Sequence, residues 1–141
     1  MNARRALLCA LPLLALGLAA RGQGAAGLAG LIEPGREKGS ISIPSFKRLL
    51  AERPDAVHLI DVSSAREFAA GSLRGASNVP INRLEKQVGE LPADKPIVFF
   101  CATGGRASEA YDTTRLLRPE LAVHFLGAQV QVGPDGVPVI R

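Results

Sequence analysis

Three apolar runs, separated by stretches with helical spacing, most restrict the folds open to this chain. They lie at residues 57–62, 97–100 and 121–126, and the second contains only apolar side chains. Short runs of this kind are typical of strands that are buried on both faces, as parallel strands are. Because the runs alternate with helical patterns, the sequence predicts an α/β fold: an open parallel sheet with helices on both faces.

Proline and glycine mark the limits of the helical stretches. Pro44 suits the first turn of a helix, Gly71 suits a helix end, and Pro119 cannot continue a helix. Together with the spacing of apolar residues, these signals predict helices over 44–53, 65–70, 82–90 and 106–118. Two further short strands are expected, at 41–43 and 77–79.

The C-terminal tail has a different pattern from the rest of the chain. Residues 129–132 and 137–140 are strand-like, and the turn sequence Gly-Pro-Asp-Gly lies between them. Strand-like segments on either side of such a turn predict a β-hairpin. We therefore expect this hairpin in addition to the parallel sheet.

Chain length and composition suit one globular domain. The 141 residues are enough for one hydrophobic core, and because Trp is absent the core must be largely aliphatic. The net charge is +4, but Arg4, Arg5 and Arg21 fall in the N-terminal segment, and without them basic and acidic residues nearly balance. The sequence has no block of basic residues interleaved with aromatics, so we expect no nucleic-acid partner.

The N-terminal segment has the pattern of an export signal. Two arginines precede an uncharged run over 6–20, which is shorter than the about 20 apolar residues that a membrane-spanning helix needs. We expect a signal peptide over 1–21, a flexible Gly/Ala-rich linker over 22–39, and a folded domain over 40–141. This predicts a periplasmic or otherwise exported protein. An uncleaved membrane anchor is the alternative for the first segment.

The segment from Cys101 to Arg106 holds the residues best suited to chemistry. An apolar strand runs into this loop and a helix follows it, which places Cys101 at the carboxyl edge of the sheet, where ligands bind in α/β folds. Glycine at 104 and 105 lets successive N–H groups turn inward, and the helix adds its positive end. Both effects stabilise a thiolate and a bound anion. We expect Cys101 to be the nucleophile, with an anion held by the backbone of Ala102, Thr103, Gly104, Gly105 and Arg106.

A simpler interpretation of the same residues is open. A cysteine after an apolar strand is often a small buried hydrophobe, and two glycines can form an ordinary turn. However, Cys9 lies in the segment that export would remove, which leaves Cys101 without a partner and favours a reactive thiol.

Two separated motifs resemble the rhodanese family of sulfurtransferases. The loop matches the family pattern Cys-x-x-Gly-x-Arg at Cys101, Gly104 and Arg106. A second match comprises residues 59–62 (LIDV), Glu67, Phe68 and Gly71, and then 74–80 (RGASNVP). The resemblance extends over residues 40–127.

The resemblance implies a five-stranded parallel sheet and a persulfide intermediate on Cys101. The sulfur donor would be thiosulfate, a polysulfide or a persulfide, and the acceptor a thiol, cyanide or sulfite. No metal or organic cofactor is implied, and a protein partner cannot be named. The loop from Cys101 to Arg106 has six residues, one fewer than in relatives that act on phosphate or arsenate.

The chain departs from the family pattern at three places near the loop. Ser63 stands where the family often has Arg, Ser72 where it often has His, and Gly127-Ala128 where Gly-Gly and a later Trp are usual. Asp61 ends a strand on the same edge as Cys101, and we expect it to support the loop rather than to take part in catalysis; a simple strand-end cap explains it equally well. Arg66 and Arg74 could attract anionic donors, but ordinary exposed surface charge is the preferred interpretation of both.

Three alternative functions predict different behaviour of the thiol. A binding or scaffold module would not need Cys101, and a phosphatase or arsenate reductase would hydrolyse a small aryl phosphate. A redox-sensing thiol would be oxidised by peroxide without taking up sulfur.

Overall fold

Four parallel strands form the central sheet of the computed structural model, which describes residue 28 and residues 30–141. The strands are β1 (His58–Asp61), β2 (Ser77–Asn78), β3 (Ile97–Phe100) and β4 (Val123–Phe125), in the order β2-β1-β3-β4. Asp61 of β1 lies opposite Phe100 of β3. The carboxyl ends of the two central strands therefore meet at one edge of the sheet.

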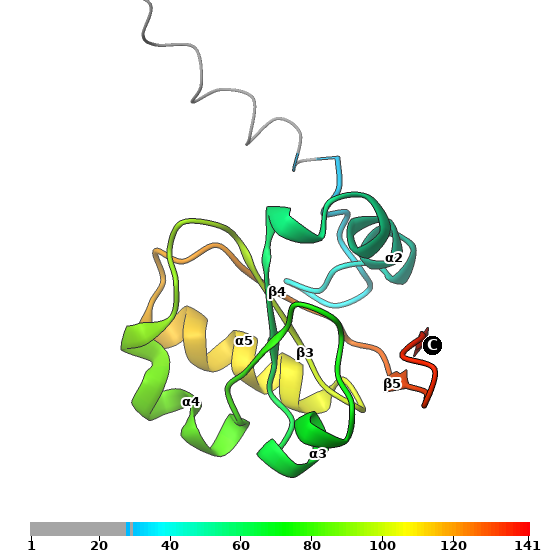
Figure 1. Cartoon of the computed structure of the whole chain (residues 1–141). Coiled ribbons are helices and arrows are strands. Elements are labelled where there is room, and N and C mark those ends of the chain that lie inside the picture. The colour runs from blue at the N-terminus through cyan, green and yellow to red at the C-terminus, as the bar shows by residue number, and fades with distance from the viewer. Residues whose placement is uncertain (1–27, 29) are drawn as a thin grey trace, which may run out of the picture.

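Helices cover both faces of the sheet, as the sequence predicts. Helix α2 (Ile43–Glu52) packs on one face, and α4 (Ile81–Gln87) and α5 (Gly105–Leu117) pack on the other (Figure 1). The short helix α3 (Ala65–Ala70) follows β1 at the carboxyl edge, and the 3-10 turns η1 (Pro54–Ala56) and η2 (Val88–Glu90) complete the connections. The α/β fold class is confirmed.

Strand β3 supplies both hydrophobic cores because its side chains alternate between the two faces. Val98 and Phe100 belong to the core under α2, whereas Ile97, Phe99 and Cys101 belong to the core under α4 and α5. All five side chains are at most 1% exposed. A strand buried on both faces explains why the segment reads as an uninterrupted apolar run.

The expected strand over 41–43 is wrong. Ser40 forms a single parallel bridge with Phe125, so the implied fifth strand is reduced to one bridge beside β4. Ile43 instead begins α2, because the Ser42 side chain accepts a hydrogen bond from the N–H of Ser45 and Pro44 fits the first turn. Local capping at Ser42 therefore ends the extended segment early.

The segment over 31–39 packs against the domain, although the sequence predicts a flexible linker as far as Gly39. The Ser45 side chain donates a hydrogen bond to the carbonyl of Leu31 and accepts one from the N–H of Glu33 at 3.0 Å. Leu31 and Ile32 pack on the core beneath α2. Composition suggests a linker here, but these two apolar side chains and the buried Ser45 hold the segment in place.

The predicted signal peptide over 1–21 lies outside the described residues. Within the part of the chain that the structure describes, no helix combines the length and the apolar character needed to span a membrane.

The C-terminal hairpin is confirmed, and it forms a separate two-stranded sheet. Strands β5 (Val130–Val132) and β6 (Pro138–Ile140) pair antiparallel. Val130 and Ile140 are buried in the core on the α2 side, so the hairpin packs on that side of the molecule (Figure 1). This arrangement brings the hairpin close to the carboxyl edge of the sheet.

Candidate functional site

Cys101 is the first residue after β3, at the edge where ligands bind in open α/β sheets. Its side chain is buried, and the N–H of Gly104 donates a hydrogen bond to its Sγ at 3.0 Å. The hydroxyl of Thr103 lies 4.0 Å from the same sulfur. A backbone N–H aimed at the sulfur at the start of a helix is a geometry that suits a nucleophilic cysteine.

Gly104 has a conformation and a packing environment that only glycine fits. Its φ is +90°, and a Cβ at this position would lie 2.9 Å from the backbone N of Ala128 and 3.0 Å from the carbonyl carbon of Gly127. The loop therefore rests directly on the backbone of the segment after β4. This contact fixes the N–H of Gly104 in the direction of the sulfur.

Helix α5 begins at Gly105 and has 13 residues, so its positive N-terminal end lies at the loop. The structure brings together the predicted anion-binding positions, which are Ala102, Thr103, Gly104, Gly105 and Arg106. Among them, Gly104 has an N–H bonded to the sulfur and Ala102 lines the adjoining pocket. Their role in binding a substrate stays a prediction.

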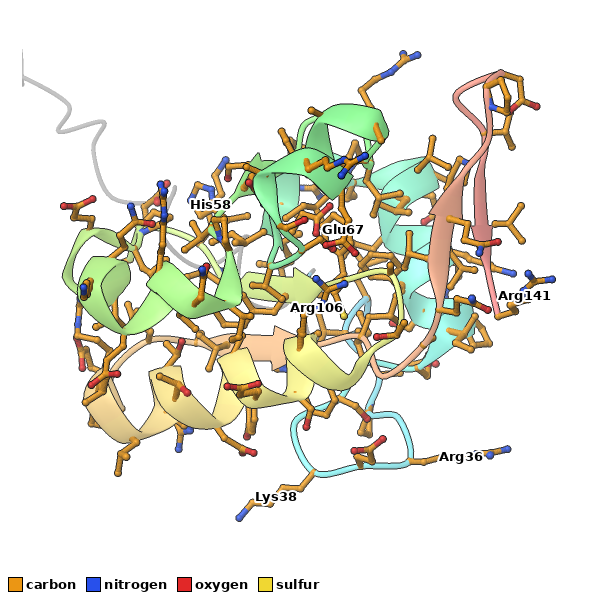
Figure 2. All side chains as sticks on the ribbon, turned by 90° about the horizontal axis from the view of Figure 1, so that it is seen from below. Arg36, Lys38, His58, Glu67, Arg106 and Arg141 are labelled. Atoms are coloured by element: carbon orange, nitrogen blue, oxygen red, sulfur yellow. The ribbon has the colours of Figure 1, made fainter. Side chains whose placement is uncertain are left out.

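Arg106 forms a bidentate ion pair with Glu67 of α3. Its two terminal nitrogens donate to the two carboxylate oxygens of Glu67 at 2.7 and 2.8 Å, and Figure 2 shows the side chains pointing toward one another. The guanidinium, followed by the hydroxyl of Ser64, holds the pKa of Glu67 well below its usual range. Glu67 in turn raises the pKa of Arg106, with a smaller contribution from Cys101. The pair ties α3 to the first turn of α5.

The ion-pair role of Glu67 was not predicted from the sequence. Ser64 and Glu67 form a capping box at the start of α3, in which each side chain bonds the other's backbone N–H. The Ser-x-x-Glu spacing at 64–67 could have indicated that box. No local pattern indicates a pairing with Arg106, which is 39 positions away.

Asp61 is buried beside the loop, and its carboxylate is held by two donors. It accepts from the N–H of Ser63 at 2.9 Å and from the hydroxyl of Ser72 at 2.6 Å. The Asn78 side chain donates to the carbonyls of both Asp61 and Ser63, at 2.9 Å each. Ser72 thus bonds Asp61 through its side chain, whereas Ser63 does so through its backbone N–H, which any residue other than proline would supply. Its supporting role stays a prediction, although the observed contacts fit one.

A pocket of about 490 Å³ opens beside Cys101. The β1–α3 segment and the Cys101 loop form one side, and the hairpin forms the other. The lining residues come from four parts of the chain: Asp61, Ser63, Glu67, Ala70, Gly71 and Ser72; Phe100, Cys101 and Ala102; Val130, Gln131, Val132 and Gly133; and Val139. Its volume is within the range of sites for small organic ligands.

Comparison with known proteins gives consistent results. The family model described as "Rhodanese-like domain" matches residues 42–137, which is more than half of the chain. A human thiosulfate:glutathione sulfurtransferase is 33% identical over 103 residues, which cover 63% of this chain and 88% of that protein. A sulfurtransferase of Allochromatium vinosum is 29% identical over 70 residues, covering 50% of this chain and 64% of that protein.

One solved structure supports the same assignment. The human single-domain sulfurtransferase TSTD1 superposes with a TM-score of 0.55 at 29% identity, covering 63% of this chain and 88% of that one. The parallel sheet, the loop at its carboxyl edge and the family match agree. The chain belongs to the rhodanese-like domain family.

Proposed function

We propose that this protein is a sulfurtransferase that carries a sulfane sulfur on Cys101. The observation that supports it best is the placement of the Cys101 sulfur: it accepts the N–H of Gly104 at 3.0 Å, at the N-terminal end of α5, and borders a pocket. A thiol in this position has a hydrogen-bond donor directed at its sulfur and a path to a small substrate. Two relatives named as sulfurtransferases add independent support.

The proposed reaction has two steps and needs no external oxidant or reductant. In the first, the Cys101 thiolate attacks the outer sulfur of the donor; a new S–S bond forms, and the donor's own bond to that sulfur breaks. With thiosulfate as donor, sulfite leaves. In the second, the acceptor attacks the outer sulfur of the persulfide, and the Cys101 thiolate is regenerated. A thiol acceptor becomes a persulfide, cyanide becomes thiocyanate, and sulfite becomes thiosulfate.

The residues around Cys101 have distinct proposed tasks. The loop backbone from Ala102 to Arg106 stabilises the anionic sulfur in both the thiolate and the persulfide. Asp61 holds the segment after β1 through Ser63 and Ser72. The Arg106–Glu67 pair keeps α3 and α5 at a fixed separation. Only Cys101 exchanges covalent bonds with the substrate.

Intact-mass measurement of the purified protein after treatment with thiosulfate or a polysulfide tests this proposal. We expect a gain of one sulfur atom that cyanide or a reductant reverses. Cys101→Ser should lower the transfer rate by about a thousandfold or more, because the nucleophile is lost. This variant keeps Cys9, so sulfur bound at the other thiol would remain visible. A folded protein with a free Cys101 that gains no sulfur from any sulfane donor would contradict the proposal and favour a non-catalytic binding module.

A further inference from the structure

The pocket beside Cys101 is lined by acidic side chains and by no basic ones, which is unfavourable for a dianion such as thiosulfate. Two of its lining residues are acidic, Asp61 and Glu67, and none of its lining residues is Lys, Arg or His. Asp61 accepts two hydrogen bonds through its carboxylate. Glu67 is ionised at neutral pH and is paired with a guanidinium that holds its pKa below the usual range. Because Glu67 is neutralised by its partner, an anionic donor that enters the pocket approaches the Asp61 carboxylate and the sulfur of Cys101, with no basic side chain among the lining residues.

Arg106 does not reverse this charge. Its two terminal nitrogens are engaged by Glu67, so the two side chains together carry no net charge, and Arg106 is not among the lining residues. Figure 2 shows the guanidinium directed at Glu67. Arg66 and Arg74, which the sequence suggests for attracting anions, do not line the pocket either. The favourable interactions for an anion come from the loop backbone around the sulfur, with a weaker one between the Arg106 guanidinium and Cys101.

The wall opposite the β1–α3 segment is apolar. Val130, Val132 and Val139 of the hairpin line it, and Phe100 of β3 also contributes apolar surface to the pocket. Val139 is 49% exposed, which leaves part of its surface available to a bound molecule. The pocket volume of about 490 Å³ is far larger than a thiosulfate ion requires. Apolar surface in a pocket of this size suits an organic group.

We propose that the preferred sulfur donor is an organic persulfide or polysulfide with an apolar body and at most one negative charge, rather than thiosulfate. This inference rests on the proposed function and specifies its donor. The Cys101 thiolate attacks the outer sulfur of R–S–SH, the S–S bond of the donor breaks, and R–S⁻ leaves while Cys101 retains –S–SH. The group R lies against the valines of the hairpin.

The first test uses the salt dependence of loading in the unchanged protein. The rate at which Cys101 gains sulfur is measured by mass spectrometry with thiosulfate and with benzyl persulfide, at salt concentrations from about 0.05 M to about 0.5 M. Because salt screens repulsion, thiosulfate loading should become faster as salt is added, and benzyl persulfide loading should change much less. A thiosulfate rate that falls with salt would show an attractive pocket and overturn the inference.

The second test adds one positive charge to the pocket. Gln131 lines the pocket and is exposed, and its side-chain oxygen accepts a hydrogen bond from Arg141 at 3.2 Å. Gln131→Lys removes only this surface contact, so the variant should fold normally. We expect it to speed thiosulfate loading by about threefold to tenfold and to change benzyl persulfide loading by less than about twofold. Val137→Lys is the matched control, because Val137 is 56% exposed on the same hairpin and does not line the pocket. It should change neither rate.

The outcomes separate the donor preference from the proposed function itself. Equal thiosulfate rates in Gln131→Lys and Val137→Lys would overturn the preference while sulfur transfer stands. Loss of loading with both donors in the unchanged protein would instead contradict the proposed function.

Discussion

The two sides of the Cys101 pocket act through different parts of the chain. On one side, the loop from Cys101 to Arg106 presents backbone N–H groups, and its one observed bond to the sulfur comes from Gly104. On the other side, the hairpin presents side chains, of which Val130, Val132 and Val139 face the pocket. The loop contributes the conditions for the sulfur chemistry, whereas the hairpin contributes a surface for the rest of the donor.

This difference implies different tolerance to substitution. The direction of the backbone N–H groups depends on the conformation of the loop. A single substitution that forbids this conformation should therefore cause a large loss of sulfur loading. Apolar surface on the hairpin is the sum of several side chains, so its effects should be graded. Substitutions on the two sides of the pocket can test this distinction.

Among variants that keep the Cys101 thiol, the largest effect is expected from Gly104→Ala. The added Cβ would lie 2.9 Å from the N of Ala128 and would occupy a φ of +90°, so we expect a loss of about 2–3 kcal/mol in the free energy of unfolding. The N–H directed at Cys101 would shift with the loop, and sulfur loading should slow by about tenfold to a hundredfold. Chemical denaturation and loading rates measure the two effects.

Gly105→Ala is the control for that substitution. Gly105 has no positive φ, and a Cβ there would meet no heavy atom within 4 Å. We expect a change in stability of less than about 1 kcal/mol, with loading nearly unchanged. If both variants behaved alike, the close contact of Gly104 with the segment after β4 would not control the site.

The loop was easier to predict from sequence than the wall opposite it. Residues 97–100 are an uninterrupted apolar run, and the glycines and helix pattern after them leave few conformations for residues 101–106. The hairpin was also predicted, from its Gly-Pro-Asp-Gly turn. Its position over the pocket was not, because it depends on how Val130 and Ile140 pack in the core.

Long-range polar contacts were the other features that the sequence did not reveal. The Arg106–Glu67 pair depends on α3 and α5 beginning side by side at the sheet edge. The bond from Ser72 to Asp61 likewise depends on the return of the chain after α3. A sequence pattern reports spacing along one element, and these contacts join separate elements.

An intermediate effect is expected from Glu67→Gln. This substitution breaks the ion pair with Arg106, which joins α3 to the start of α5 directly after the Cys101 loop. The two side chains are 28% and 45% exposed, so solvent screening limits the expected loss to about 0.5–1 kcal/mol at pH 7. Because folding lowers the pKa of Glu67, this stabilisation is complete above the usual Glu pKa of about 4.3 and declines as the pH falls below it. Thermal unfolding from pH 7 to pH 3 should therefore show the variant and the original protein converging.

A surface pair far from the pocket provides the comparison for Glu67→Gln. Glu33 pairs with Arg48, at 52% and 46% exposure, and Glu33→Gln should leave sulfur loading unchanged. Glu67→Gln should slow loading by about twofold to fivefold, because the start of α5 loses its tie to α3. Equal loading in the two variants would mean that the pair stabilises the fold without positioning the loop.

The smallest effect is expected from Val139→Ala on the hairpin. The substitution removes two carbon atoms from a side chain that is 49% exposed and lines the pocket. At about 0.8 kcal/mol for each fully buried CH₂, partial burial against a donor should raise the KM for benzyl persulfide by about twofold to threefold. Thiosulfate kinetics should not change, since that donor has no apolar body.

Val137→Ala is the control, because Val137 is an exposed residue of the same hairpin that does not line the pocket. It should change neither donor's KM. A rise in KM for both donors with Val139→Ala would show that the hairpin supports the loop rather than contacting the donor, and the distinction between the two sides of the pocket would fail.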